Sequence, residues 1–127
     1  MLRILIVDDS EASAQTLGWM VEIFGYDIKL AHNGQDALAL AKSFKPHVVL
    51  LDIGLPGMNG YEVCQRLRND PEIKNLVIIA QTGWGEDQHK TMSQEAGFDY
   101  YMVKPIEMEK LRQLLLSLEP TVAGMFN

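Results

Sequence analysis

Short apolar runs alternate with longer amphipathic segments along the whole chain. Three of these runs, at residues 2–7, 48–51 and 77–80, are apolar throughout apart from Arg3. Continuous runs of this length are typical of strands that are buried on both faces of a parallel sheet. The pattern therefore predicts three central strands.

Two further segments predict strands at the edges of the same sheet. In residues 27–31, Ile28 and Leu30 alternate with polar neighbours, as expected of a strand with one exposed face. Residues 100–103 form a short fifth strand. The alternating pattern of the first segment and the shortness of the second lead us to place these two strands at the edges of the sheet.

The segments between the predicted strands have the apolar spacing of helices. Three of them repeat apolar residues at i, i+3, i+4 and i+7, namely Leu17, Met20, Val21 and Phe24; Ala37, Leu40, Ala41 and Phe44; and Leu111, Leu114, Leu115 and Leu118. A further helix is predicted over residues 60–68, and the weakest over residues 86–96. Ser10 or Asp9 can cap the first helix, and Gly25 ends it.

Five strand–helix units predict an α/β fold with a doubly wound parallel sheet and five helices. The edge positions select the strand order 2-1-3-4-5, the flavodoxin-like arrangement. We assign residues 1–119 to this domain and residues 120–127 to a C-terminal tail. In such sheets, ligands bind beyond the carboxyl ends of the strands, where the strand order reverses. That rule predicts a site just after the first and third strands.

Composition narrows the function classes. The chain has 127 residues, enough for one domain, and its 47% hydrophobic and 22% charged residues are typical of a globular protein. The net charge of −6, with no basic run, argues against nucleic-acid binding by this domain alone. Cys64 is the only cysteine, and no membrane segment or signal peptide is recognisable, so we expect a cytoplasmic protein.

Polar residues gather at the predicted carboxyl edge. Asp8 and Asp9 follow the first strand, Asp52 ends the third, Thr82 ends the fourth, and Lys104 follows the fifth. Clustered carboxylates repel one another unless a cation neutralises them, and oxygen ligands favour a hard ion such as Mg²⁺. A metal ion, a lysine and an oxygen nucleophile are the parts that phosphoryl transfer requires.

Each of these residues also has a purely structural interpretation. Asp9 could cap a helix, Asp52 could be a solvated loop carboxylate, Thr82 could be an ordinary strand residue, and Lys104 could be a surface charge. Their joint occurrence at the predicted ligand edge is what favours a functional site.

Four stretches are similar to one known family. They are ILIVDDS at 4–10, VVLLDIGLPGMNGYEV at 48–63, IIAQTGWG at 78–85 and AGFDYYMVKP at 96–105. In order and spacing, the chain resembles the receiver domain of two-component response regulators over essentially its whole length. The sequence of the last two stretches is most similar to receivers of hybrid sensor histidine kinases. The resemblance therefore leaves two alternatives open, a stand-alone relay protein or one domain of a longer, membrane-attached hybrid kinase.

The resemblance implies a role for each site residue. Asp52 is the expected phospho-acceptor. Asp9, Asp52 and the main-chain carbonyl of Gly54 are expected to bind Mg²⁺ (Mn²⁺ is an alternative), with Asp8 acting largely through water. Lys104 would contact the phosphoryl oxygens.

The same resemblance implies a switch. Thr82 would turn its hydroxyl toward the phosphoryl group, and Tyr101 would rotate inward. The peptide bond before Pro105 is expected to be cis. A sensor histidine kinase or a histidine phosphotransfer protein would supply the phosphoryl group, and a downstream partner would bind the face of the fourth helix, fifth strand and fifth helix. The module would signal by changing shape and would not be an enzyme.

Two positions depart from the usual pattern of the family. Gly54 has no side chain where many receivers carry one, and Trp84 is larger than is common at its position. Both are candidate modulators of how long the aspartyl phosphate persists.

Three other classes compete with this interpretation. A phosphohydrolase of similar topology would place a second aspartate two residues after the nucleophile, where this chain has Gly54. A nucleotide- or flavin-binding domain would have a glycine-rich loop where this chain has Asp8, Asp9 and Ser10. A receiver-like adaptor that is never phosphorylated usually lacks one of the acidic pair or the lysine, whereas this chain has Asp8, Asp9 and Lys104.

Overall fold

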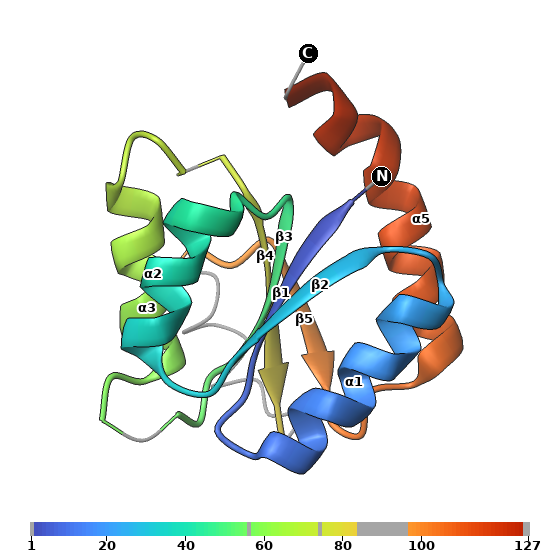
Figure 1. The fold of residues 1–127 in the computed structure, drawn as a ribbon, viewed down its shortest axis with the longest axis horizontal. Coiled ribbons are helices and arrows are strands. Elements are labelled where there is room, and N and C mark those ends of the chain that lie inside the picture. The colour runs from blue at the N-terminus through green and yellow to red at the C-terminus, as the bar shows by residue number, and fades with distance from the viewer. Residues whose placement is uncertain (1, 56, 74, 84–96, 126–127) are drawn as a thin grey trace.

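The structure is a computed structural model, and it describes residues 2–55, 57–73, 75–83 and 97–125, with side chains up to residue 119. Within these ranges the chain folds as a three-layer α/β sandwich, in which one sheet lies between two layers of helices (Figure 1).

All strand pairs in the sheet are parallel, and the strand order is β2-β1-β3-β4-β5. The predicted flavodoxin-like order and both edge positions are confirmed. The strand bounds lie within two residues of those predicted: β1 Arg3–Val7, β2 Asp27–Ala31, β3 Val48–Asp52, β4 Val77–Thr82 and β5 Tyr100–Val103.

Four helices lie within the described residues: α1 Glu11–Ile23, α2 Gly34–Phe44, α3 Gly60–Asn69 and α5 Met108–Met125. The fifth predicted helix, over residues 86–96, falls outside the described residues. The backbone of α5 continues into the segment that we assigned to the tail. Among the helices of the described part, none has the length and apolar character needed to cross a bilayer.

Local sequence explains where three of the helices begin. Ser10, Asn33 and Asn59 each precede a helix, and each side-chain oxygen accepts a hydrogen bond from the backbone N–H three residues later. These bonds satisfy donors that the first turn of a helix leaves unpaired. After α1, Gly25 has a φ of +96°, a conformation that favours glycine and turns the chain toward β2.

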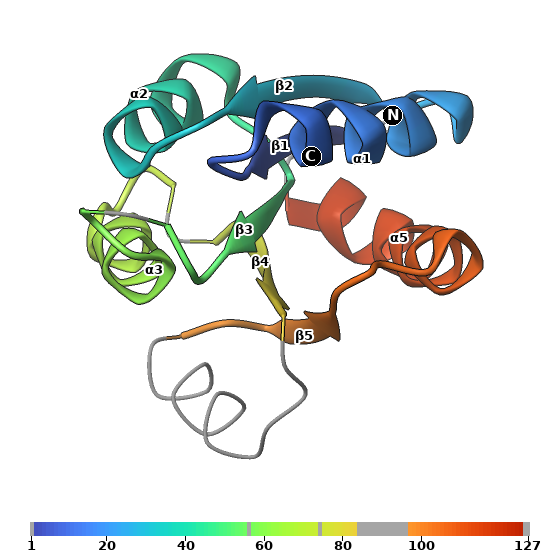
Figure 2. The same ribbon diagram turned by 90° about the horizontal axis from the view of Figure 1, so that it is seen from below.

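The sheet separates two apolar cores. On one face, side chains of α1 and α5 pack against alternate residues of the central strands, including Ile79 of β4. On the other face, α2 and α3 pack against the intervening residues, including Ile78 and Ala80. Figure 2 shows the two pairs of helices on opposite sides of the strands. Cys64 lies in the second core, where burial raises the pKa of its thiol to about 11, in agreement with a packing role.

The register between β1 and β3 determines where two of the predicted site residues emerge from the sheet. Val7 of β1 lies opposite Leu51 of β3, so the next residues, Asp8 and Asp52, emerge side by side at the carboxyl edge. A shift by one residue in either strand would exchange its side chains between the two cores and would separate this pair.

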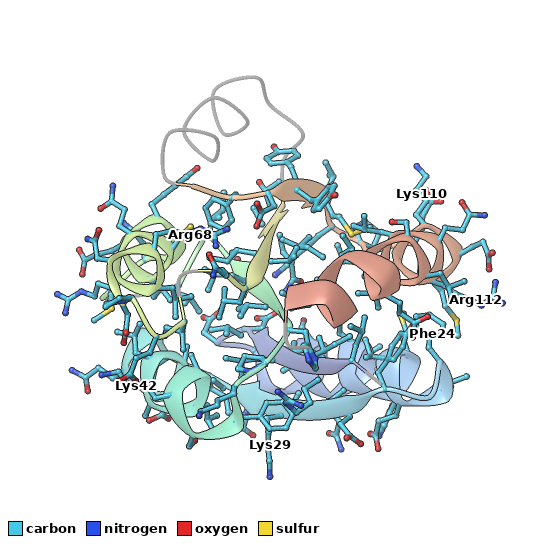
Figure 3. All side chains as sticks on the ribbon, turned by 90° about the horizontal axis from the view of Figure 1, so that it is seen from above. Phe24, Lys29, Lys42, Arg68, Lys110 and Arg112 are labelled. Carbon is cyan, nitrogen blue, oxygen red and sulfur yellow. The ribbon has the colours of Figure 1, made fainter. Side chains whose placement is uncertain are left out.

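Arg68 connects α3 to the strands at the far edge. Its guanidinium donates to the carbonyls of Leu76 and Gly97 and to the carboxylate of Asp99. Asp99 also accepts a bond of 2.8 Å from the backbone N–H of Ile78. Figure 3 shows Arg68 between α3 and the strands, whereas Lys29 and Lys110 point outward. Arg68 is therefore a structural charge that fixes the beginnings of β4 and β5.

His47 performs a similar function at the amino edge of the sheet. Its Nδ1 accepts a hydrogen bond of 2.8 Å from the backbone N–H of Arg3, and its backbone N–H donates to the Arg3 carbonyl. The imidazole is buried, and burial together with the nearby Arg3 charge lowers the pKa of His47. The fold therefore favours the neutral ring.

We expect His47→Asn to flatten the pH dependence of stability below neutrality. In the unfolded chain, histidine takes up a proton as the pH falls through about 6.5, whereas folded His47 resists protonation. The stabilisation that neutral His47 contributes is therefore fully present above that pH, and it is lost as the pH falls through the lowered pKa of His47. Asparagine can still accept from Arg3 but does not titrate. Urea unfolding between about pH 5 and pH 8 measures the two slopes, and parallel profiles would contradict the prediction.

Candidate phosphoryl-transfer site

Five residues predicted for the site converge at the carboxyl edge of the sheet. Asp8 and Asp9 follow β1, Asp52 and Thr82 are the last residues of β3 and β4, and Lys104 follows β5. The backbone N–H of Lys104 donates to the Thr82 carbonyl at 2.6 Å, so the end of β5 is held against the end of β4.

Three carboxylates form one acidic cluster. One oxygen each of Asp8, Asp9 and Asp52 lies within 4.8 Å of the other two. Asp8 and Asp52 are buried, whereas Asp9 is exposed. Buried carboxylates this close require positive charge or hydrogen-bond donors near them.

Lys104 supplies the positive charge. Its Nζ lies 2.9 Å from Oδ2 of Asp52 and 3.2 Å from Oδ2 of Asp8. Burial by itself lowers the pKa of Lys104, but the bonds to Asp52 and Asp8 outweigh that effect and raise it. The ammonium group is therefore held in its charged form between two carboxylates.

Backbone donors hold the second oxygen of each buried carboxylate. Oδ1 of Asp8 accepts from the N–H of Ser10 at 3.0 Å, and Oδ1 of Asp52 accepts from the N–H of Gly54 at 2.9 Å. Nδ1 of His32 lies 3.1 Å from the carbonyl oxygen of Asp8. The two bonds to the Oδ1 atoms fix the orientation of the carboxylates and leave their Oδ2 atoms directed at Lys104.

The cluster suits a hard divalent cation. Counted at their formal charges, the three carboxylates exceed the one ammonium group by two negative charges. All the donor atoms are oxygens, which is the ligand type that Mg²⁺ and Mn²⁺ prefer. Exposed Asp9 lies on the solvent side of the cluster, where an ion with retained water ligands would enter.

The structure describes all the remaining predicted site residues except Trp84. Thr82 is buried at the end of β4, and half-buried Tyr101 packs against the core on the α2–α3 side. The peptide bond between Lys104 and Pro105 is cis. Gly54 is exposed on the loop that follows β3. Trp84 lies outside the described residues.

Sequence reasoning missed the role of Gly60. A Cβ on this residue would lie 2.5 Å from Cα of Ile53 and 2.6 Å from the carbonyl oxygen of Asp52. The first turn of α3 therefore approaches the end of β3 as closely as only glycine permits. The sequence pattern identifies Gly60 only as a helix boundary. The residues around it give no sign that the backbone of Asp52, eight residues earlier, lies so close.

Comparisons with known proteins agree on one family. Residues 4–116 match the sequence model described as "Response regulator receiver domain". The chain is 37% identical to Protein PilH of Pseudomonas aeruginosa over 98% of this chain and 100% of that protein. It is 36% identical to the DNA-binding dual master transcriptional regulator RpaA of Synechocystis sp., over 87% of this chain but only 46% of RpaA. The chain thus spans about half the length of that relative.

Solved structures show the same fold. A chemotaxis protein, CheY4 of Vibrio cholerae, superposes with a TM-score of 0.87 at 28% identity, covering 92% of this chain and 98% of CheY4. The signal receiver domain of a DNA-binding response regulator from Colwellia psychrerythraea gives a TM-score of 0.88 at 30% identity, over 94% of this chain and 99% of that domain.

We expect Gly60→Ala to lower the free energy of unfolding by about 1–3 kcal/mol, because the added methyl group must displace the backbone of Asp52 or Ile53. At an uncrowded helical position the same change would stabilise the protein. Gly54→Ala is the matched control, since its Cβ would meet only Oδ1 of Asp52, at 3.5 Å. Urea unfolding measures both, and equal effects of the two substitutions would show that the close approach is unimportant.

Proposed function

Because the chain belongs to the family of response regulator receiver domains, we propose that Asp52 accepts a phosphoryl group and that the domain then changes shape to transmit a signal. The donor would be the phosphohistidine of a sensor histidine kinase or of a histidine phosphotransfer protein. The observation that carries the proposal is the position of Asp52, whose Oδ2 lies 2.9 Å from Lys104 beside two further carboxylates.

The proposed step transfers the phosphoryl group from nitrogen to oxygen. An oxygen of the Asp52 carboxylate forms a bond to phosphorus while the phosphorus–nitrogen bond breaks, and the imidazole leaves with the electron pair of that bond. Asp52 is suited to this role because the Gly54 N–H fixes one of its oxygens and Lys104 contacts the other. Lys104 also offsets the repulsion between the carboxylates and the incoming anion.

Asp9, Asp52 and the Gly54 carbonyl would hold Mg²⁺ or Mn²⁺, with Asp8 acting through water. Bound there, the ion supplies positive charge to the phosphoryl oxygens. Asp9 contributes an exposed carboxylate and so completes the acidic cluster from the solvent side. The carboxylate cluster supports this assignment, since without a cation it would repel a phosphoryl donor.

Phosphorylation would redistribute the contacts of Lys104. The new group adds about −1.5 to −2 of charge, and it would compete with Asp8 for the ammonium group. Thr82 ends the neighbouring strand and is the next hydroxyl able to respond, and Tyr101 lies on the adjoining edge strand. We therefore place the downstream partner on the face that includes β5 and α5, together with the predicted helix over residues 86–96.

We infer that the domain is a switch and not a turnover enzyme. Gly54 offers no carboxylic acid at the position where a related phosphohydrolase would place its general acid. With a net charge of −6, the domain is not expected to bind nucleic acid by itself. We expect it to work in the cytoplasm, where Cys64 would remain reduced.

Asp52→Asn should reduce phosphorylation to background, because the amide oxygen is a poor nucleophile. The measurement is incorporation of hydroxylamine-labile phosphate from acetyl phosphate in the presence of Mg²⁺, because an aspartyl phosphate is a labile acyl phosphate. Asp27→Asn is the control, since Asp27 is exposed at the opposite edge of the sheet, at the start of β2. Undiminished incorporation in the Asp52 variant would disprove the assignment.

Asp9→Ala should weaken Mg²⁺ binding by at least about tenfold and leave the fold intact, because Asp9 is exposed. Isothermal titration measures the affinity, and circular dichroism checks the fold. Glu11→Ala is the matched control, a nearby exposed carboxylate in the first turn of α1.

Chelation by EDTA should also stop phosphorylation of the wild type. Equal Mg²⁺ affinity in the Asp9 and Glu11 variants, or full phosphorylation in excess EDTA, counts against the metal site.

A further inference from the structure

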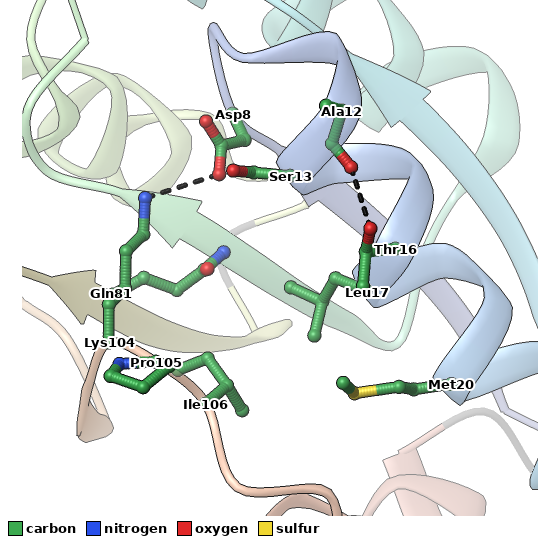
Figure 4. Close-up of a pocket in the computed structure, with 10 residues that line it drawn as sticks. All are labelled: Asp8, Ala12, Ser13, Thr16, Leu17, Met20, Gln81, Lys104, Pro105 and Ile106. Atoms are coloured by element: carbon green, nitrogen blue, oxygen red, sulfur yellow. Dashed lines mark hydrogen bonds and ion pairs between the residues drawn. The ribbon is translucent and has the colours of Figure 1, made fainter.

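A cleft opens beside the acceptor site, between α1, the end of β4 and the loop that leads from β5 to α5 (Figure 4). Its volume is about 510 Å³, within the range typical of small-molecule sites. Asp8 and Lys104 form one wall, and Asp52 does not line it. The cleft therefore borders the acceptor site without containing the acceptor.

Gln81 lies at the inner end of this cleft. Side chains alternate along β4, so Gln81 points to the same face as Ile79, toward α1 and α5. The residue is 1% exposed, and Figure 4 shows its amide directed into the space between Asp8 and Leu17. Its Nε2 is buried and has no hydrogen-bond partner among the residues that the structure describes.

A buried amide donor without a partner is unfavourable, and native structures contain few of them. Within the described part of the chain, Gln81 is the one residue whose buried side-chain nitrogen or oxygen is in this state. Two other polar side chains of the cleft are engaged, since Thr16 donates to the Ala12 carbonyl and Lys104 donates to Asp8. Ser13, which also lines the cleft, is exposed. The structure thus leaves one buried side-chain donor without a partner among the described residues, on a residue that lines the inner end of the cleft.

The rest of the cleft is largely apolar. Leu17 and Met20 of α1 form one side, and Pro105 and Ile106 form the other. Leu17 is buried, while Met20 and Ile106 are half-buried at the margin of the core. A ligand could therefore gain apolar contacts on two sides while its polar end reaches Gln81.

We propose that this cleft binds an uncharged organic ligand whose carbonyl oxygen accepts a hydrogen bond from Nε2 of Gln81 and whose apolar part lies between Leu17, Met20 and Ile106. A neutral ligand is favoured because the charges in the wall, Asp8 and Lys104, already pair with each other. A charged ligand would lose its hydration without finding a free counter-charge there. This site goes beyond the proposed phosphoryl transfer and does not depend on it.

The first test uses the wild-type protein and N-cyclohexyl-2-pyrrolidone, a neutral probe with one carbonyl and one apolar ring. Titration is followed by NMR of the side-chain amides and methyl groups. We expect saturable shifts of the Gln81 amide and of the Leu17 and Ile106 methyl groups. No saturation, shifts centred elsewhere, or a persistent water on Gln81 that the probe does not displace would overturn the proposal.

The second test removes the donor. Gln81→Met keeps the approximate size of the side chain and should weaken probe binding by about threefold to tenfold, the range expected for one neutral hydrogen bond. It should also raise the Tm by about 2–8 °C, because an unsatisfied buried amide is replaced by an apolar group. Gln113→Met, at an exposed position of α5, is the matched control and should change neither quantity.

Each outcome of these variants decides the proposal. Unchanged affinity in Gln81→Met, or a lowered Tm with the fold retained, shows that Gln81 is not an uncommitted donor and overturns it. Should Gln81→Met fail to fold, the shift of the Gln81 amide in the wild type decides alone.

Discussion

Lys104 bridges two buried carboxylates, and the arrangement of the sheet is what makes the bridge possible. Asp8 and Asp52 emerge side by side because β1 and β3 are neighbours in register. Lys104 begins beyond β5, on the far side of β4, and its long side chain crosses the end of that strand to reach both carboxylates at 3.2 and 2.9 Å. The cis peptide to Pro105 follows directly. Without this ammonium group, two like charges would remain buried together, which is strongly unfavourable.

Under the proposed function, the same bridge would respond to a new anion at the site. Backbone donors hold one oxygen of each carboxylate, so the contacts that can change are those to Lys104. A phosphoryl group on Asp52 would replace a single carboxylate charge with a larger one and draw the ammonium group away from Asp8. Because the backbone N–H of Lys104 donates to the Thr82 carbonyl, we expect a movement of Lys104 to reach the ends of β4 and β5.

The sheet order and the meeting of most candidate site residues at one edge can be predicted from the sequence, and the reason is physical. Central parallel strands must be apolar on both faces, so continuous and alternating runs separate β1, β3 and β4 from the edge strand β2. Parallel strands also end at one edge, which brings Asp8, Asp52 and Lys104 together. The roles of Gly60, Arg68 and Gln81 depend instead on close approaches between distant segments, and neither composition nor periodicity encodes these contacts.

The end of β4 joins the two proposed sites. Thr82 points to the face of α2 and α3, and the adjacent Gln81 points to the face of α1 and α5, because side chains alternate along the strand. By the same alternation Asp52 points to the face of α1 and α5, and it is the register partner of Gln81. A phosphoryl group on Asp52 that draws on Thr82 and a ligand that binds Gln81 would therefore act on neighbouring residues at the ends of β3 and β4. Lys104 reinforces this connection, since it lines the cleft and also contacts Asp52. Whatever influence a bound ligand has on the phosphorylated conformation, phosphorylation must have the same influence on the affinity for that ligand, because coupling between two sites is reciprocal.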